Sequence, residues 1–434
     1  MPSFSSLKLF APALLLAAAL PASAAAQGSH TRPLVLTPAT PAEVGMRADL
    51  PARVDSLIEA AIADGATPGA SVAIGRHGRL VLLRGYGHTD WAEGAVISPP
   101  PAVTDSTIYD MASLTKVTAT TTAAMILQEE GKLDIDRPVA SYVPELSAPD
   151  KAGITVRMLL THSGGFEAFA KLFAPENGAL RGREAYLKAI NERPLAYEPG
   201  TKTIYSDWDF VLMQAVIEHI TGQTLDQFTH DRVFGPLGMR DTGFRPDASL
   251  KPRIAPTEIQ TWRCGNEACP AGQTGGKVWG QVHDENAWAL GGVSGHAGLF
   301  SSARDMAIFA EMLLNGGQYG NVRLLHPQTI SYWTSRKSAS SSRALGWDTP
   351  SPGSSAGHYF APRSWGHTGY TGTSVWMDPH KDLFVVLLTN RVDPTRENHK
   401  HVALRRALAD LVQESIVDAP LHDWEADVRD GNKR

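Results

Sequence analysis

Residues 70–86 read ASVAIGRHGRLVLLRGY, two apolar runs separated by a His-Gly pair. The runs at 70–75 and 80–86 are rich in Val, Leu and Ile, and a two-residue connection containing Gly is typical of a β-hairpin. Near the other end of the chain, residues 374–377 and 383–389 have the same strand-like composition. The predicted strands therefore cluster at both ends of the chain.

Helical patterns lie beside and between these strands. Apolar residues recur at helical spacing over 52–64, which a glycine follows, and again over 402–416. The middle of the chain, from about 117 to 328, is mostly helical with long Gly- and Pro-containing loops, and it shows no internal repeat. We therefore expect an α+β fold: a central antiparallel sheet built from both termini and flanked by helices, with an inserted mainly helical region.

Composition and the N-terminus narrow the class of protein. The formal net charge of the 434 residues is -5, and no basic run suggests a nucleic-acid partner. Lys8, an apolar run at 9–20 and the small residues that follow resemble a secretory signal peptide, although an uncleaved membrane anchor is the alternative. We expect a signal peptide at 1–26 and a secreted or periplasmic protein. A linker at 27–46, one domain at 47–418 and a tail at 419–434 complete the expected organisation.

The chain has two cysteines, Cys264 and Cys269. In an oxidising compartment they could close a small disulfide loop; two free thiols are the alternative. Their spacing is not C-x-x-C and no second Cys/His pair completes a set of four ligands, so a metal or redox site is disfavoured.

The strongest candidate for chemistry is at residues 110–116, which read DMASLTK and open a helical stretch that stops at Gly131. Ser113 and Lys116 are three residues apart and share a helix face. A serine hydroxyl needs a base beside it to become a nucleophile, and a lysine amine can be that base if burial lowers its pKa. Taken alone, the spacing also fits an N-cap serine followed by a solvated lysine.

Two later motifs favour the catalytic interpretation. Residues 198–207 read EPGTKTIYSD, and residues 366–373 read GHTGYTGT. The set and order S-x-x-K, Y-x-[ND], [KH]-T-G resembles the serine β-lactamase and penicillin-binding-protein superfamily. The closest likeness is to its class C β-lactamase-like branch, which includes D-alanyl-D-alanine carboxypeptidases and esterases. Further landmarks of that kind are LLTHSGG at 159–165, PLGM at 236–239 and GVSGHAGLF at 292–300.

The resemblance implies a role for each motif. Ser113 would be acylated, with Lys116 and Tyr205 sharing the proton transfer and one relaying for the other. The backbone N–H groups of Ser113 and Tyr370 would form the oxyanion hole. The residues expected to bind substrate are Asp207, His367, Thr368, Gly369 and Tyr370.

Two of these positions depart from the family's usual pattern. Many members have Asn where this chain has Asp207; an ionised Asp can only accept hydrogen bonds, and a helix N-cap is its alternative role. Where β-lactamases usually have Lys, this chain has His367, which is near half-charged at mildly acidic pH and mostly neutral above it. These departures weaken the inference of a β-lactam substrate and leave room for esters.

Other motifs carry less weight. Residues 353–357 match G-x-S-x-G but lie in a Ser/Pro-rich loop without the strand-turn-helix setting that pattern needs. Residues 282–287, with His296 nearby, contain possible ligands but no H-E-x-x-H motif, so a structural or pocket-lining role is favoured over metal binding. We expect a serine hydrolase that needs no metal or organic cofactor and acts on a small molecule or cell-wall peptide. A non-catalytic cell-wall peptide or penicillin binder is the alternative. Loose membrane or cell-wall association and the oligomeric state stay open.

Overall fold

The computed structural model describes residue 1 and residues 34–431, with side chains described as far as residue 427. The predicted signal peptide and the first part of the predicted linker lie outside these residues. Within the described part of the chain, no helix has both the length and the apolar character needed to span a bilayer.

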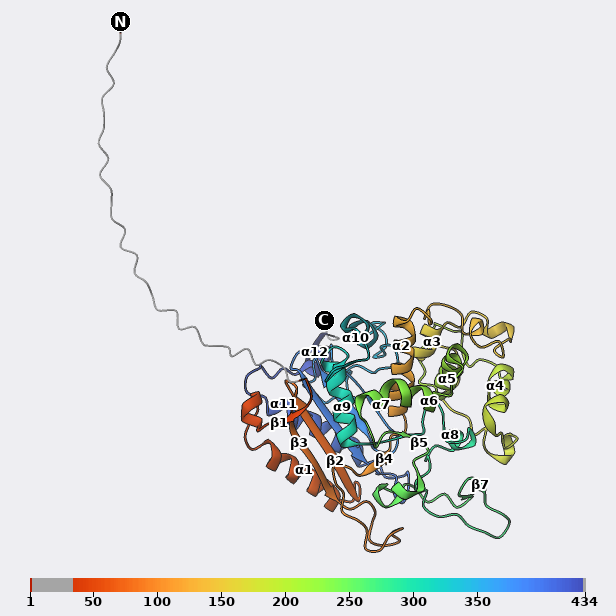
Figure 1. Cartoon of the computed structure of the whole chain (residues 1–434), viewed down its shortest axis with the longest axis horizontal. Helices are drawn as coiled ribbons and strands as arrows, with labels where there is room; N and C mark the ends of the chain where they lie inside the picture. Colours follow the sequence, from red (N-terminus) through yellow and green to blue (C-terminus); the bar gives the residue numbers. More distant parts are fainter. Residues whose placement is uncertain (2–33, 432–434) are drawn as a thin grey trace. The chain divides into compact units, whose positions relative to one another are not determined.

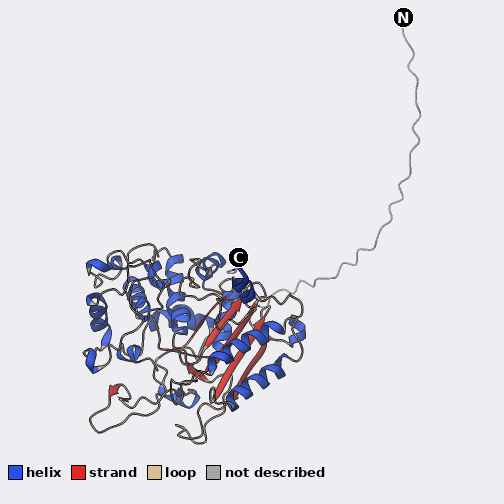
Figure 2. Ribbon diagram, turned by 180° about the vertical axis from the view of Figure 1, so that it is seen from behind, coloured by secondary structure: helices blue, strands red, loops and turns tan. Residues whose placement is uncertain are grey.

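A six-stranded sheet forms the centre of the fold, in the order β1-β3-β2-β13-β12-β11 (Figures 1 and 2). The strands are β1 (Thr37–Pro38), β2 (Gly69–Arg76), β3 (Arg79–Gly87), β11 (Trp365–Thr368), β12 (Ser374–Asp378) and β13 (Leu383–Thr389). All neighbours pair antiparallel except β1, which runs parallel to β3. Because β2 pairs with β13, the two ends of the chain meet in the middle of the sheet, as predicted.

The hairpin between β2 and β3 has the predicted tight turn. His77 and Gly78 have φ angles of 56° and 72°. Positive φ at both central residues defines the type I′ turn, whose twist matches that of the strands it joins. The His-Gly pair therefore sets the register that places β2 at the centre of the sheet.

Helices cover both faces of the sheet (Figures 1 and 2). On one face α1 (Leu50–Ala63) packs with α11 (His401–Glu414), and on the other α9 (Ala303–Leu314) packs on β2 and β13. Strand β13 is buried along its whole length, with Val385 and Leu387 in one core cluster and Val386 and Leu388 in the other. A strand buried on both faces reads as a continuous apolar run.

The inserted region is mainly helical, as predicted, and lies to the right of the sheet in Figure 1. Its helices are the π-helix η2 (Lys116–Thr121), α2 (Thr122–Glu129), α3 (Val156–Leu160), α4 (Gly182–Glu192), α5 (Asp207–Thr221), α6 (Leu225–Thr229), the π-helix η6 (His230–Phe234), α7 (Gly235–Leu237) and α8 (Glu285–Ala289). Helix α10 (Pro327–Thr334) follows α9. Helix α5 is buried along most of its length, so it forms the axis of this region.

Small sheets that the sequence did not reveal also lie in the inserted region. Strands β4 (Ile108–Asp110), β8 (Leu299–Ser302) and β5 (Gly243–Phe244) form a three-stranded sheet. Two-residue strands form the hairpins β6 (Arg263–Cys264) with β7 (Glu267–Ala268) and β9 (Gln318–Tyr319) with β10 (Val322–Arg323). Asp110 thus ends a strand, and the helical stretch predicted from residue 110 begins only at Leu114, directly after Ser113.

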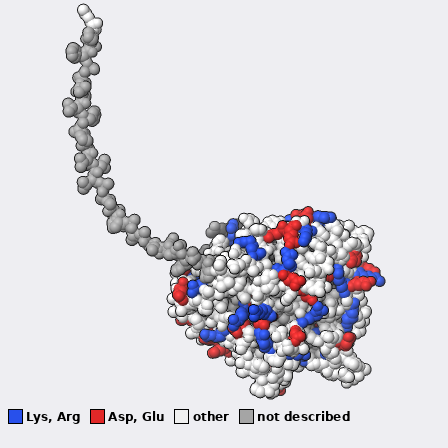
Figure 3. Space-filling model, viewed as in Figure 1, with Lys and Arg blue, Asp and Glu red and all other residues white. Residues whose placement is uncertain are grey.

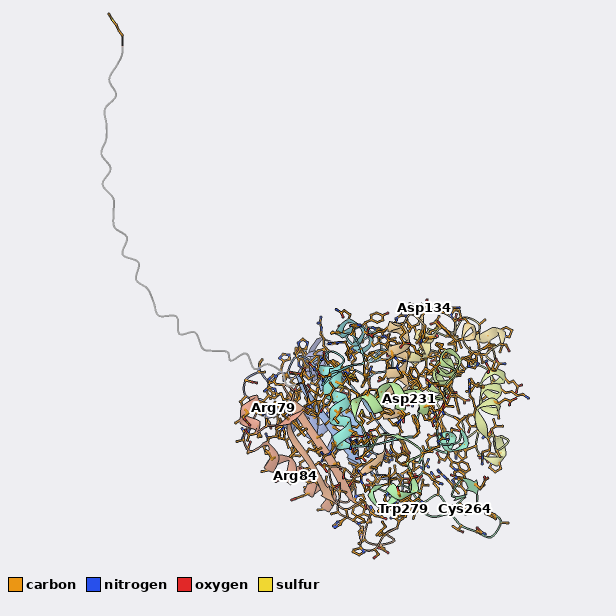
Figure 4. The ribbon with its side chains drawn as sticks, viewed as in Figure 1. Arg79, Arg84, Asp134, Asp231, Cys264 and Trp279 are labelled. Carbon is orange, nitrogen blue, oxygen red and sulfur yellow. A yellow bond between two sulfur atoms is a disulfide. The ribbon has the colours of Figure 1, made fainter. Side chains whose placement is uncertain are left out.

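The structure also bears on three further predictions, which concern the two cysteines, the linker and the C-terminal tail. Cys264 and Cys269 form a disulfide across the β6–β7 hairpin, in the lower part of Figure 4. Residues of the predicted linker already belong to the folded body, since β1 pairs with β3 and Val44 and Met46 are buried in the core. The predicted tail contains helix α12 (Trp424–Gly431), and Glu425 on that helix pairs with Arg406 of α11.

Candidate active site

The segment before Ser113 is held in a strained turn. Asp110 is buried; its Oδ1 accepts a hydrogen bond from the Ala112 N–H at 2.8 Å and its Oδ2 accepts one from the His283 N–H at 2.6 Å. Ala112 has a φ of 46°, in the left-handed region that non-glycine residues seldom occupy. Strain of this kind persists where surrounding contacts over-determine the backbone, and it concentrates at functional sites.

Lys116 lies directly beneath Ser113 and is fully buried. Its Nζ donates to Ser113 Oγ at 3.1 Å, to Asp207 Oδ1 at 2.7 Å and to the His296 carbonyl oxygen at 3.1 Å. An ammonium group has three N–H donors, and here each has one acceptor. The geometry therefore suits the protonated form of the lysine.

The electrostatics agree with that geometry. Burial is the largest influence on the pKa of Lys116 and lowers it, but the charge and hydrogen bond of Asp207, together with the nearby Tyr205, outweigh burial, so the pKa is raised. The condition under which a lysine serves as a neutral base, a pKa lowered by burial, is not met. Lys116 is a buried cation beside the candidate nucleophile.

Tyr205 faces this cation. Lys116 Nζ lies 4.8 Å from the centre of the Tyr205 ring. The phenolic oxygen is buried and, within the described part of the chain, makes no hydrogen bond. A phenol beside a fixed ammonium is suited to stabilise negative charge on its oxygen, so Tyr205 is placed to exchange a proton with a bound reactant.

Asp207 does not cap helix α5. The N-cap is Ser206, whose Oγ accepts a hydrogen bond from the Trp208 N–H at 3.2 Å, and Asp207 is the first residue of the helix. Its carboxylate, 16% exposed, forms the ion pair with Lys116. The N-cap alternative is therefore wrong, and the Asp207 carboxylate is instead the counter-ion of Lys116.

His162, within the LTHSGG landmark, supports Tyr205 from behind. It has a φ of 55°, its Nδ1 accepts a hydrogen bond from the Ser206 N–H at 3.2 Å, and its ring lies 4.4 Å from that of Tyr205. Burial raises the pKa of Asp209 well above its ordinary value, and its Oδ2 lies 3.1 Å from His162 Nδ1. The sequence marked this stretch as a landmark without assigning it this supporting role.

The third motif, His367-Thr368-Gly369, leads into a turn that contacts the segment carrying Ser113. His367 and Thr368 lie on the edge strand β11, which the sequence analysis did not predict, and Gly369 and Tyr370 lie in the turn to β12. Thr371 Oγ1 donates to the Asp110 carbonyl at 2.7 Å, and Thr373 Oγ1 donates to the Met111 carbonyl at 3.1 Å. These two bonds fasten the turn to the segment that carries Ser113.

Helix α11 holds the same turn from the other side. Arg405 Nη2 donates to the carbonyl oxygens of Gly369 and Thr373 at 2.5 and 2.7 Å. Among the described residues no acceptor receives the backbone N–H of Ser113 or of Tyr370. Two unpaired N–H groups on adjacent, fixed segments are what an oxyanion hole requires. The Tyr370 side chain is 48% exposed, in keeping with a role for its backbone alone.

His367 is not the cation that its position in the motif suggests. The ring is buried, and its Nδ1–H donates to the Thr368 carbonyl oxygen at 2.8 Å. Burial, followed by the positive charges of Arg343 and Lys116, holds the pKa of His367 well below its usual range. The expectation of a half-charged histidine at mildly acidic pH is therefore wrong: His367 is neutral, and its Nε2 is an acceptor.

Arg343 is a positive charge of the pocket that the sequence analysis missed, and Arg391 and Arg405 also line that pocket. A pocket of about 300 Å³ contains Ser113, Tyr205, His367 and Arg343. The Arg343 guanidinium carbon lies 4.9 Å from the centre of the Tyr205 ring. Its Nη1 is buried without a hydrogen bond, and the nearest carboxylate, that of Asp348, is 3.9 Å away. A planar cation with a free donor is suited to bind a carboxylate.

The stretch 282–287 contributes to the same neighbourhood. Ligand atoms of Asp207, Asp284 and His296 lie within 4.8 Å of one another. His296 Nε2 and Asp284 Oδ1 are 2.9 Å apart, and Asp207 is paired with Lys116. These groups thus have partners within the protein, in keeping with the structural role that the sequence analysis allowed. The G-x-S-x-G match at 353–357 lies in turns without the strand and helix of a nucleophile elbow. Its Ser355 accepts a hydrogen bond from Trp376.

Comparison with known proteins shows which family this chain is similar to. A family model described as beta-lactamase matches residues 54–410. A protein of Salmonella paratyphi B named "Putative D-alanyl-D-alanine carboxypeptidase" is 34% identical over 418 residues, covering 91% of this chain and 93% of that protein. A protein of Salmonella newport with the same name gives the same figures.

Solved structures show the same fold. EstCE1, a hydrolase with promiscuous acyltransferase activity, aligns with a TM-score of 0.66 at 23% identity, covering 84% of this chain and 98% of its own. A class C beta-lactamase aligns with a TM-score of 0.65 at 17% identity, covering 86% and 98%. An octameric penicillin-binding protein homologue from Pyrococcus abyssi aligns with a TM-score of 0.62 at 20% identity, covering 84% and 79%.

The ion pair between Asp207 and Lys116 predicts a pH effect. Replacing Asp207→Asn removes the partner that raises the pKa of Lys116, and loss of one adjacent opposite charge lowers such a pKa by about one to three units. If the lysine acts as a cation, activity is lost as pH rises through its pKa. The alkaline limb of kcat/KM against pH for p-nitrophenyl acetate then moves to lower pH in the variant.

Asp231→Asn is the matched control, because Asp231 is exposed on η6 outside the pocket. It is expected to leave the profile in place. A neutral lysine base would behave in the opposite way: Asp207→Asn would then gain activity on the acidic side of the profile, and that result would contradict the cationic role.

The turn at Gly369 predicts a steric effect. A Cβ at this position would lie 2.1 Å from Thr373 Oγ1 and 2.4 Å from the Met111 carbonyl oxygen. Gly369→Ala therefore pushes the turn away from the nucleophile segment and is expected to lower kcat for p-nitrophenyl acetate about 100-fold, the usual effect of losing one oxyanion donor. Gly243→Ala, which meets nothing within 4 Å, is the control. Equal kcat values for the two variants would refute this positioning of the turn.

Proposed function

Because this chain belongs to the β-lactamase family of serine hydrolases, we propose that it cleaves carboxylate-bearing acyl substrates through an acyl-enzyme on Ser113, and that its substrate class is the D-alanyl-D-alanine-type peptide. The observation that carries the proposal is the single pocket that contains Ser113, Tyr205 and the guanidinium of Arg343, whose buried Nη1 makes no hydrogen bond and is 3.9 Å from the Asp348 carboxylate. The 34%-identical relative named for D-alanyl-D-alanine carboxypeptidase activity supports the choice of peptide.

The first half of the reaction acylates Ser113. Tyr205 relays a proton: as Ser113 Oγ attacks the carbonyl carbon, the serine proton passes to the phenolic oxygen and the phenol's own proton begins to move to the scissile nitrogen. The Lys116 cation stabilises the negative charge that develops on the phenolic oxygen during this transfer. The N–H groups of Ser113 and Tyr370 hold the developing oxyanion. When the C–N bond breaks, this proton transfer to the departing amine is complete. The products of this step are an ester on Ser113 and the free leaving residue.

The second half hydrolyses that ester. Water gives a proton to Tyr205 and its oxygen to the carbonyl carbon, and the proton then passes to Ser113 Oγ as the acyl group leaves as a carboxylic acid. Lys116 keeps its proton throughout, because Asp207 stays paired with it. The Nε2 of neutral His367 faces the same pocket and offers an acceptor to an N–H or O–H group of the substrate.

Export is part of the proposal. The N-terminal sequence resembles a signal peptide, and the Cys264–Cys269 disulfide is typical of an oxidising compartment. A cell-wall peptide is also found outside the cytoplasm. We therefore assign the protein to the periplasm or the extracellular space.

A panel of nitrocefin, diacetyl-Lys-D-Ala-D-Ala and p-nitrophenyl acetate tests the substrate class. We expect release of D-alanine by the wild type, with kcat/KM at least about 100-fold above that of Ser113→Ala. Turnover that survives in Ser113→Ala would assign the activity to another group. A Ser113→Ala variant that binds the peptide beside an inactive wild type would favour the non-catalytic binder.

Arg343→Gln tests the carboxylate contact. Hydrogen bonds to charged groups are worth about 1.5–3 kcal/mol, so the variant is expected to lose roughly 10- to 100-fold in kcat/KM on the peptide and little on the neutral ester. Arg240→Gln, at an exposed arginine outside the pocket, is the matched control. An equal loss on peptide and ester would show that Arg343 supports the fold and does not read the carboxylate.

A further inference from the structure

A second pocket adjoins the active site across Arg343. It has a volume of about 580 Å³ and is formed by helix α3 with the residues that follow it, at 157–163, and by two loop segments, at 200–204 and 337–343. Arg343 lines both pockets, and Ile204, next to Tyr205 in the chain, lines this one. We call it the basic side pocket. Because Arg343 lines both pockets, they adjoin at this residue, and a substrate bound at Ser113 that extends past Arg343 enters the basic side pocket.

The lining of the basic side pocket has one sign of charge. Its charged residues are Arg157, Lys202, Lys337 and Arg343, and the rest are mostly Ser, Thr and Gly. No Asp or Glu is among the described residues that line it. Over the face drawn in Figure 3, in contrast, acidic and basic side chains lie interspersed. Hydroxyl groups and cations together are the donors that bind anionic groups in proteins.

Part of this positive charge has no counter-ion. Arg157 is paired with both oxygens of Asp136, at 2.7 and 2.8 Å. Lys202 and Lys337 form no ion pair with any described carboxylate. Lys337 Nζ instead donates to the Tyr332 carbonyl oxygen and lies 3.9 Å from the centre of the Tyr332 ring. Burial and the nearby Arg157 charge lower the pKa of Lys337 to about 8. An anion in the pocket would relieve this crowding of like charges.

We propose that the basic side pocket is a subsite for an anionic side chain on the leaving residue of the substrate. In the proposed function, on which this inference rests, Arg343 faces the carboxylate of that residue beside Ser113. A group that continues past Arg343 then belongs to the leaving residue, and the chemistry of the pocket selects a carboxylate there. The enzyme accordingly prefers an acidic residue after the scissile bond to its neutral isostere.

Two peptides that differ in one functional group test the subsite: diacetyl-Lys-D-Ala-D-Glu and diacetyl-Lys-D-Ala-D-Gln. We expect the wild type to cleave the D-Glu peptide with a kcat/KM about 10-fold higher. In the double variant Lys202→Gln/Lys337→Gln the ratio is expected to fall below about 2-fold. Because both peptides are measured on the same protein, partial unfolding of the variant cancels from the ratio. Lys188→Gln, on α4 outside the pocket, is expected to keep the wild-type ratio.

Binding measurements distinguish a failure of this inference from a failure of the proposed function. Calorimetry with Ser113→Ala measures the affinity of each peptide without turnover, and inorganic phosphate as a competitor shows whether a free anion alone fills the pocket. Tighter binding of the D-Glu peptide that depends on the two lysines supports the subsite. If, in addition, the wild type cleaves neither peptide, the proposed function is contradicted and the subsite is not. Equal cleavage and equal binding of the two peptides would overturn the subsite and leave the proposed function standing. A phosphate ion that binds without any preference for the D-Glu peptide would also overturn it.

Discussion

The buried ammonium of Lys116 is the constraint around which the site is organised. A charge taken out of water is costly unless it is paired and fully hydrogen-bonded. Here the three acceptors come from separate segments: Ser113 before η2, Asp207 at the start of α5 and the backbone of His296. The requirement to satisfy one cation therefore fixes three parts of the inserted region relative to one another. It also explains why an aspartate suits the second motif of this chain, since a neutral amide would leave the buried charge without its counter-ion.

The sheet is joined to this cluster through a single turn. The hydroxyls of Thr371 and Thr373 bond to the carbonyls of Asp110 and Met111, while Arg405 holds the turn from helix α11. The contacts link residues more than 250 positions apart in the chain. Neither the sheet nor the helical region forms the proposed oxyanion site alone, because Ser113 and Tyr370, which would each contribute one N–H group, belong to different segments. This is the physical reason that the strands at the two ends of the chain must pair before the site exists.

The sequence was informative where a local pattern decides the outcome. Apolar runs and a two-residue turn located β2, β3, β12 and β13, and helical spacing located α1 and α11. Spacing and motif order identified Ser113, Lys116 and Tyr205, which the structure brings together. Strand β11 was missed because its four residues include a glycine and two polar side chains. Electrostatic states were also beyond reach: the protonation of Lys116 and the neutrality of His367 depend on burial and on partners far away in the sequence. No spacing rule points to Arg343, which lies in a Ser-rich loop.

The position of Arg343 in a loop suggests which part of the fold determines the substrate specificity of the active site. In this chain the third motif offers a neutral acceptor, and the cation that faces the reacting centre comes from the loop before β11. The same loop supplies Lys337 to the basic side pocket. In the proposed function, the nucleophile, the proton carrier and the oxyanion donors are thus positioned by the buried cluster and the turn, whereas charge recognition falls to loops. Loops tolerate substitution far better than a buried ion pair does. The choice of substrate can therefore change by exchange of loop residues while Ser113, Lys116 and Tyr205 keep their geometry.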